Sequence, residues 1–117
     1  MIITRTPFRL PLGGGGTDLP SYYRTNGGFL ISAAIDKYMY IILNQRFEKS
    51  IRVSYSTTEI VESVDQIEHP IIRESLKFMD IEDRIGITVT ANIPAKTGLG
   101  SSSSFAVGLY FEEIFVF

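Results

Sequence analysis

The segment 94–102 combines residue types that can hold a phosphate group. It runs Pro-Ala-Lys-Thr-Gly-Leu-Gly-Ser-Ser, with two glycines close to a pair of serines. Gly98 and Gly100 have no Cβ atom, so they permit positive φ and let backbone N–H groups come close to a phosphate oxygen. Ser101 or Ser102 can cap a following helix and offer a hydroxyl oxygen to a Mg²⁺ ion that bridges phosphates. These residues predict an anion-binding loop.

The elements on either side should present this loop at the start of a helix. Ile85–Ala91 alternates apolar residues with glycine and threonine, which predicts a strand. We predict a helix over Ser101–Phe115, in which Phe105 and Leu109 have the spacing to pack on a sheet. The first turn of a helix carries unpaired backbone N–H groups and a partial positive charge, which together favour phosphate. Lys96 would add a full positive charge nearby.

The loop has a second interpretation, as an ordinary connector rich in glycine and serine that ends in a helix cap. The strand before it and the apolar helix after it favour the phosphate site. No Gly-Lys-Ser or Gly-Lys-Thr follows the glycines, so the loop is not of the Walker A type. It also lacks the Gly-x-Gly-x-x-Gly pattern, so a dinucleotide site is not supported.

A second group of residues with binding chemistry lies in the segment 7–18. Arg9 is a fixed positive charge at the end of a predicted strand, and Asp18 is an acceptor for two sugar hydroxyls. The glycines between them let a ligand lie against bare backbone. The alternative is a flexible surface loop in which Asp18 only caps a turn.

The rest of the chain supplies further strands and another helix. Apolar spacing predicts a helix over His69–Met79. Thr17 or Asp18 is expected to cap a short helical turn that runs through Tyr23, before a turn at Asn26-Gly27. β-branched and aromatic residues predict strands over Ile2–Leu10, Gly28–Ile35, Lys37–Phe47, Ile51–Tyr55 and Glu59–Val61. This order predicts an α+β fold, with an antiparallel or mixed sheet and helices on one face.

The bulk composition is typical of one soluble domain. The chain has 117 residues, of which 44% are apolar and 21% charged, and its net charge is −2. Interspersed charges argue against nucleic acid as a partner. No apolar run approaches the roughly 20 residues of a transmembrane helix, so we expect no membrane partner. The absence of cysteine fits a cytoplasmic location.

The segment 110–117 is unusually apolar for a chain terminus, with large apolar side chains on both sides of Glu112 and Glu113. One interpretation is a C-terminal helix docked on its own core. The other is a truncated chain that has lost the part against which this segment would pack. We favour the second interpretation, because chain termini are usually exposed and polar.

The two binding segments together resemble the GHMP kinases. Segment 94–102 is similar to the second motif of that family, Pro-x-x-x-Gly-Leu-Gly-Ser-Ser, and segment 7–18 is similar to the first. The residues that match the first motif are Pro7, Arg9, Leu12, Gly14, Thr17 and Asp18. Galactokinases have Glu-His where this chain has Gly15-Gly16. The sequences at 14–18, 20–23 and 34–38 more closely resemble the heptose 7-phosphate kinases.

The resemblance implies an ATP-dependent kinase with a ribosomal protein S5 domain 2-like N-terminal domain. It would transfer the γ-phosphate of ATP to the C1 hydroxyl of a heptose 7-phosphate-like sugar, with ATP and Mg²⁺ as cofactors. Arg9 would act near the transferred phosphoryl group, and Asp18, Gly15, Gly16 and Thr17 would bind the sugar phosphate. The ATP phosphates would lie on Lys96, Thr97, Gly98, Leu99, Gly100, Ser101 and Ser102, and the last two would also hold Mg²⁺.

Residues 1–117 would then be the N-terminal part of such a kinase, without its C-terminal domain. Family members carry a third glycine-rich motif and an acceptor-side aspartate further along, so we expect impaired activity. The alternatives are a non-catalytic nucleotide-binding remnant and a kinase for another sugar. Candidate cations for the 7-phosphate are Arg5, Arg24, Lys37 and Lys96. We expect a structural role for His69. The sequence leaves open whether Tyr22 and Tyr23 line the sugar site, and it does not predict an oligomeric state.

Overall fold

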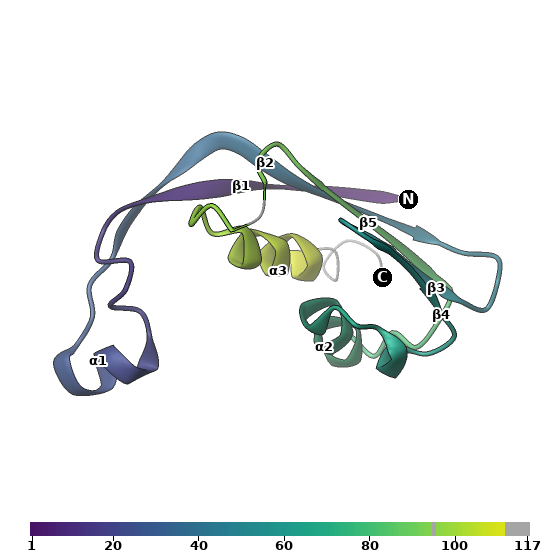
Figure 1. The fold of residues 1–117 in the computed structure, drawn as a ribbon. Coiled ribbons are helices and arrows are strands. Elements are labelled where there is room, and N and C mark those ends of the chain that lie inside the picture. Colours follow the sequence, from purple (N-terminus) through teal and green to yellow (C-terminus); the bar gives the residue numbers. More distant parts are fainter. Residues whose placement is uncertain (95, 112–117) are drawn as a thin grey trace.

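One mixed sheet organises the chain in the computed structural model, which describes residues 1–94 and 96–111 (Figure 1). The strand order is β1-β2-β5-β3-β4. β3 and β5 are parallel, and the other neighbouring pairs are antiparallel. The elements are β1 Ile2–Gly13, α1 Pro20–Asn26, β2 Ile31–Gln45, β3 Ile51–Ser54, β4 Thr58–Val61, a short 3-10 helix η1 Val64–Gln66, α2 Pro70–Phe78, β5 Ile85–Ala91 and α3 Ser101–Phe111.

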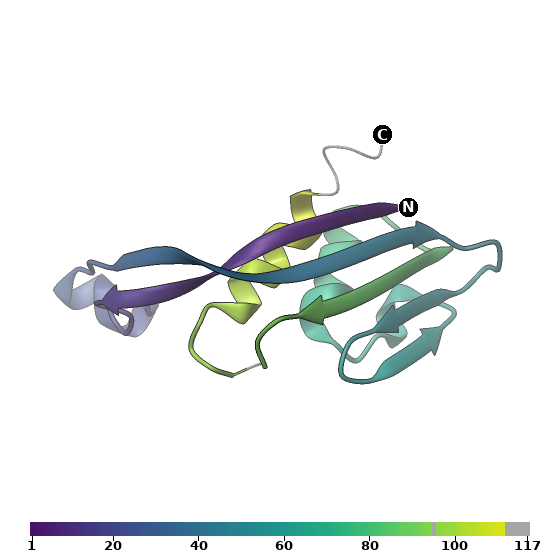
Figure 2. The ribbon, with the colours of Figure 1, turned by 90° about the horizontal axis from the view of Figure 1, so that it is seen from above.

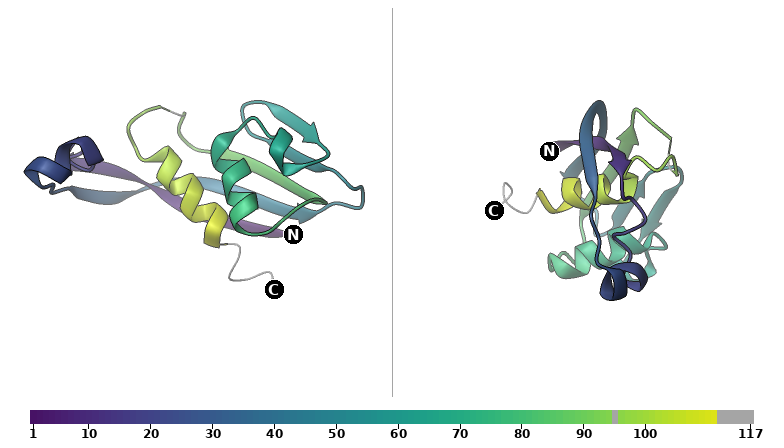
Figure 3. Two further views of the ribbon diagram at one scale, coloured as in Figure 1. Left: turned by 90° about the horizontal axis from the view of Figure 1, so that it is seen from below. Right: turned by 90° about the vertical axis from the view of Figure 1, so that its left-hand side faces the viewer.

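The core lies between the sheet and the two helices α2 and α3, which cover the same face of it (Figures 1 and 3). Phe105 and Leu109 of α3 are buried there, as their spacing predicted. β2 and β5 contribute Ile41 and Ile87, each 1% exposed. The α+β prediction, with a mixed sheet and helices on one face, is therefore confirmed.

β1 and β2 form a long hairpin that extends beyond the rest of the sheet and ends in α1 (Figure 2). Every residue of α1 is exposed. The N-cap of α1 is Leu19, which makes no side-chain cap bond, so the predicted cap at Thr17 or Asp18 is wrong. The helix ends at the predicted Asn26-Gly27 turn, where Gly27 has φ +72°.

β2 is a single strand, whereas the sequence predicted two strands that meet at Asp36-Lys37. The two halves differ in register against β1, because Pro7 pairs with Tyr38 while Arg9 pairs with Ala34. One residue of β1 therefore opposes three residues of β2, which is a bulge and does not end the strand. β1 continues past its predicted end to Gly13, and its prolines are tolerated because it lies at the edge of the sheet.

The remaining elements follow the predictions with small changes at their ends. β5 has the predicted bounds. α2 begins one residue later than predicted, because His69 occupies the N-cap position. The 3-10 helix Val64–Gln66 was not predicted. α3 starts at Ser101, but its predicted end at Phe115 and the predicted packing of segment 112–117 lie outside the described residues.

Candidate active site

The loop between β5 and α3 has the backbone shape that its glycines predict. Gly98 and Gly100 have φ of +74° and +77°, in the left-handed region that favours glycine. Lys96 also has a positive φ, +64°. The hydroxyl of Thr97 donates a hydrogen bond to the carbonyl of Pro94 (3.3 Å). The side of Gly98 where a Cβ would lie is open, with no heavy atom of the described chain within 4 Å.

Gly100 marks the start of α3. Its carbonyl accepts the backbone N–H of Ser104 at 2.9 Å, which places Gly100 at the N-cap position. The expectation that Ser101 or Ser102 caps the helix is therefore wrong, because both lie inside the first turn. Their backbone N–H groups, with that of Ser103, precede the first possible intrahelical donor and can bind an anion.

Arg9 lies against this loop, so the structure brings the two predicted motifs together. Its backbone N–H donates to the carbonyl of Leu99 at 3.0 Å. Its side chain covers Gly100, where an added Cβ would lie 2.9 Å from Cγ and 3.1 Å from Nε of Arg9. Strict alternation along β1 would put Arg9 on the same face as Arg5. The irregular register between Pro7 and Arg9 breaks this alternation.

Two further hydrogen bonds hold α3 on β1, and the sequence analysis did not single out three of their residues, Thr4, Ser104 and Gly108. The hydroxyl of Ser104 donates to the carbonyl of Pro7 (2.9 Å), and that of Thr4 donates to the carbonyl of Gly108 (3.0 Å). An added Cβ on Gly108 would lie 2.8 Å from the hydroxyl of Thr6, so only glycine allows this close approach. The available signal was the small-residue spacing of 100, 104 and 108 beside buried Phe105 and Leu109.

Two of the predicted sugar-binding residues, Thr17 and Asp18, line a hollow of about 420 Å³ next to α1. Within the described chain this hollow is lined by Thr17, Asp18, Tyr23, Gly28, Phe29 and Leu30. Gly15, Gly16 and Tyr22 are not in that lining. Of the two tyrosines left open by the sequence, the structure thus places Tyr23 at the hollow.

Thr17 holds the loop beside this hollow in shape. Its hydroxyl donates to the carbonyl of Gly14 (2.7 Å) and accepts the backbone N–H of Phe29 (3.0 Å). Gly28 lies so close that an added Cβ would collide with the carbonyl of Thr17. The hydroxyl of Thr17 is therefore used within the loop, whereas the carboxylate of Asp18 is exposed.

The predicted sugar-binding residues near α1 and the phosphate loop before α3 are not brought into contact. The α1 end of the hairpin lies apart from the start of α3 (Figures 1 and 3). The candidate cations are also spread out. The guanidinium of Arg5 stacks on Tyr38, 4.5 Å from the ring centre, Arg24 lies in the last turn of α1, and Lys96 lies on the phosphate loop.

The donor set fits a nucleotide with its phosphate-bound Mg²⁺ better than a metal held by protein alone. The described residues contain no group of three or more His, Cys, Asp or Glu side chains that could hold a metal ion. Mg²⁺ usually keeps several waters and binds through phosphates and one or two protein oxygens. Ser101 and Ser102, in the first turn of α3, could supply such oxygens.

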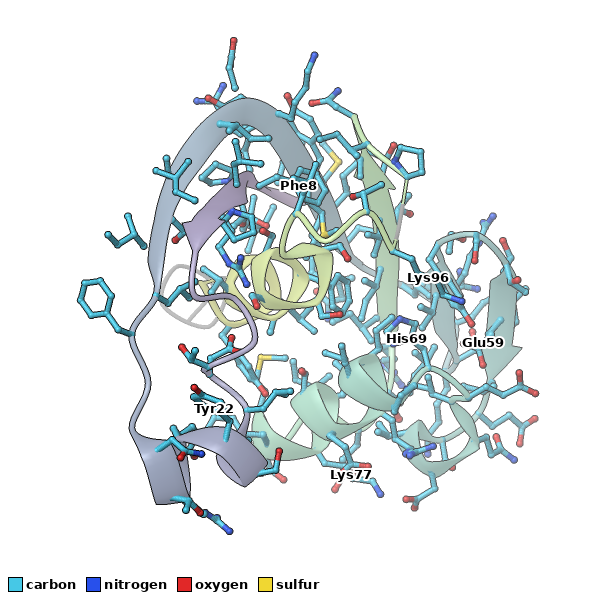
Figure 4. All side chains as sticks on the ribbon, turned by 60° about the vertical axis from the view of Figure 1, so that its left-hand side comes forward. Phe8, Tyr22, Glu59, His69, Lys77 and Lys96 are labelled. Atoms are coloured by element: carbon cyan, nitrogen blue, oxygen red, sulfur yellow. The ribbon has the colours of Figure 1, made fainter. Side chains whose placement is uncertain are left out.

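His69 has a structural role, as predicted, and it connects α2 to α3. Its Nδ1 accepts the backbone N–H of Ile72 (3.4 Å) at the start of α2. Its ring packs on Tyr55 and on Phe105 of α3, with ring centres 5.0 and 5.4 Å apart. Figure 4 shows His69 near Glu59 of β4. Burial lowers the pKa of His69, and the negative charge of Glu59 partly opposes this shift.

Comparison with known proteins shows which family this arrangement resembles. Residues 60–111 match the protein family described as GHMP kinases N terminal domain. Over this segment the chain is similar to the GHMP kinases. The match includes β5, the phosphate loop and α3. No helix among the residues that the structure describes is long and apolar enough to cross a membrane.

A curated relative covers most of the chain. The D-glycero-alpha-D-manno-heptose 7-phosphate kinase of Campylobacter jejuni is 29% identical over 120 residues, which cover 92% of this chain and 35% of that protein. This chain therefore spans about a third of the length of that kinase.

Solved structures share the fold. A D-glycero-D-manno-heptose 1-phosphate kinase from Bacteriodes thetaiotaomicron has a TM-score of 0.78 at 24% identity, and the match covers 93% of this chain and 40% of that one. The mevalonate kinase of Methanococcus jannaschii has a TM-score of 0.67 at 22% identity and covers 92% of this chain and 38% of that one. At these identities the likeness establishes the fold alone.

Proposed function

We propose that this chain binds ATP at the loop 96–102 and belongs to an ATP-dependent sugar kinase of the GHMP type. The kinase would transfer the γ-phosphate to the C1 hydroxyl of a heptose 7-phosphate-like sugar. The observation that carries the proposal is the contact between Arg9 and Gly100, which puts a guanidinium beside the amides that start α3. The name of the Campylobacter jejuni relative supports the class of sugar.

In this proposal the chain positions phosphates and neutralises their charge. Phosphoryl transfer requires these two things more than covalent chemistry. The amides of Ser101 and Ser102 would hold phosphate oxygens, and Arg9 would stabilise negative charge on the group in transfer. A hydroxyl of Ser101 or Ser102 would hold Mg²⁺, which neutralises further charge when bound. Lys96, exposed on the loop, would add a positive charge.

The sugar would lie at the hollow beside α1. We propose that Asp18 accepts hydrogen bonds from its hydroxyls, with backbone contacts from Gly15, Gly16 and Thr17. The α1 end of the hairpin and the start of α3 lie apart in this structure (Figure 1). We further propose that residues 1–117 correspond to the N-terminal domain of the kinase, and that transfer requires the third glycine-rich motif and the aspartate of its C-terminal part.

Two measurements on the 117-residue chain test this proposal. The first is calorimetric titration with MgATP, where the chain should bind and Gly100→Asp should not, because its side chain would collide with Arg9 and repel phosphate. Circular dichroism checks that the variant folds. A wild-type chain that binds no MgATP at millimolar concentration would refute the nucleotide site.

The second measurement is ³¹P NMR of the chain with MgATP and D-glycero-D-manno-heptose 7-phosphate. A new C1-phosphate signal would show transfer by this chain alone, against our expectation that the C-terminal part is required. MgATP binding without transfer is the expected result, and it equally fits a non-catalytic nucleotide-binding domain. A chimeric protein separates a kinase domain that needs its C-terminal part from a non-catalytic nucleotide-binding domain. In this chimera, residues 1–109 replace the matching part of the Campylobacter jejuni relative, and the transfer assay is repeated. Transfer restored only with another sugar would correct the substrate.

A further inference from the structure

We propose that Ser104 is a positioning residue for the phosphate loop, because its buried hydroxyl fixes the start of α3 relative to Arg9. The proposal rests on the proposed nucleotide site. Ser104 is 5% exposed and lies one turn into α3, on the side that faces β1. It would therefore act on bound phosphates through the backbone that it holds and not by touching them.

Two hydrogen bonds attach the loop to β1 on either side of Gly100. The hydroxyl of Ser104 donates to the carbonyl of Pro7 at 2.9 Å, and the backbone N–H of Arg9 donates to the carbonyl of Leu99 at 3.0 Å. Between the two bonded residues of β1 lies Phe8, which is 0% exposed. Two attachments on either side of this buried residue of β1 fix both the position and the direction of the first helical turn.

Ser104 makes hydrogen bonds both to the phosphate loop and to β1. Its backbone N–H donates to the carbonyl of Gly100, while its side chain donates to β1. Gly100 is in turn the residue that the Arg9 side chain covers. Without the hydroxyl, the carbonyl of Pro7 loses this donor, and the amides of the first turn can shift relative to the guanidinium. Ser104 thus sets the distance between two groups that are proposed to bind the same phosphates.

Thr4 offers a matched control for this hydrogen bond. Its hydroxyl donates to the carbonyl of Gly108 at 3.0 Å and so joins the same strand to the same helix. Gly108 lies further along α3 and away from the loop. Thr4→Val removes that hydroxyl with little change of shape, as Ser104→Ala removes the other. A purely structural role of Ser104 predicts equal effects of the two substitutions at the loop.

The test compares both variants in the full 117-residue chain by amide NMR and by calorimetric titration with MgATP. Both should lower the melting temperature. Ser104→Ala should shift the amide signals of residues 98–102 and weaken MgATP binding about three- to tenfold. Thr4→Val should leave the signals in place and the affinity within about twofold. Ser104→Cys, whose thiol is a weaker donor, should fall between Ser104→Ala and the wild type, and it replaces Ser104→Ala if that variant does not fold.

The outcomes separate the positioning role from the nucleotide site. Loop signals that do not move in Ser104→Ala, or that move equally in Thr4→Val, would overturn the positioning role even in a chain that binds MgATP. A wild-type chain that does not bind MgATP would overturn the function of the site. In that case the amide signals would still report whether Ser104 holds the loop, but not any effect on a ligand.

Discussion

Gly100→Ala should disturb the candidate site more than Gly98→Ala, although the two glycines have nearly the same backbone conformation. Their φ angles are +77° and +74°, so an alanine is strained at either position. The surroundings differ. A Cβ on Gly100 would lie 2.9 Å from Cγ of Arg9, whereas a Cβ on Gly98 would meet no heavy atom of the described chain within 4 Å. The pair therefore separates backbone strain from the Arg9 contact.

The expected loss of stability follows from the backbone strain and from the contact with Arg9. An L-residue in the left-handed region costs about 1–2 kcal/mol, and both variants should lose this much stability. Only Gly100→Ala must also displace Arg9, and an extra methyl in a closed contact costs about 1–3 kcal/mol. Arg9 is half-buried and can partly move away, so we expect an additional loss of about 1 kcal/mol. Urea unfolding followed by circular dichroism measures both losses.

Binding and a double mutant complete this prediction. Displaced Arg9 should weaken MgATP binding about tenfold in Gly100→Ala, since a charge-assisted contact contributes about 1.5 kcal/mol or more. Gly98→Ala should change it less. In an Arg9→Ala background, Gly100→Ala should cost no more stability than Gly98→Ala, because the collision is gone. Equal losses in the wild-type background, or an excess that persists without Arg9, would refute the contact on which the site is built.

Three further substitutions test other contacts. Burial lowers the pKa of His69 below its ordinary value of 6.5, so the stability from the neutral ring is present above that pH and is lost as the pH falls below it. His69→Asn keeps a cap acceptor but does not titrate. Between about pH 7.5 and about pH 5.5 its free energy of unfolding, measured with urea, should therefore fall less than that of the wild type. An equal fall in both proteins would contradict this. Ser75→Ala should raise the free energy of unfolding in urea by about 1 kcal/mol, because the buried Ser75 hydroxyl has no hydrogen-bond partner among the described residues. A lower free energy of unfolding would point to a partner that this structure does not show. Thr17→Val should speed hydrogen exchange of the Phe29 amide about fivefold, from the loss of about 1 kcal/mol, and unchanged exchange would show that the loop does not depend on the hydroxyl.

Local patterns were sufficient to predict the elements that present the phosphate loop. Alternating apolar residues over Ile85–Ala91 predict a strand, and the apolar spacing after Ser101 predicts a helix. The structure contains both elements. The positive φ at Gly98 and Gly100 was also expected from the residue type. The order of these elements predicted the α+β sheet with helices on one face.

Features that depend on pairing between distant segments could not be predicted. Asp36-Lys37 locally predicts the end of a strand. In the structure β2 continues through these residues, which form a bulge opposite β1. The contact between Arg9 and Gly100 joins two segments that are far apart in the sequence, so no local pattern encodes it. The cap at Leu19 was missed because Thr17, the better capping residue, is bonded to Gly14 and Phe29 instead. The roles assigned to the site residues toward ligands stay predictions.

The strand order has a consequence for how this chain folds. β1 with β2 and β3 with β4 are hairpins of segments that follow one another in the chain. The short connection 55–57 lets the second hairpin close quickly, whereas residues 14–30 separate the strands of the first. β5 comes later in the chain and inserts between β2 and β3, so it joins two units that already exist. The phosphate loop leaves directly from β5. A newly made chain should therefore complete its two hairpins first, and acquire the candidate site only in the step that makes the sheet whole.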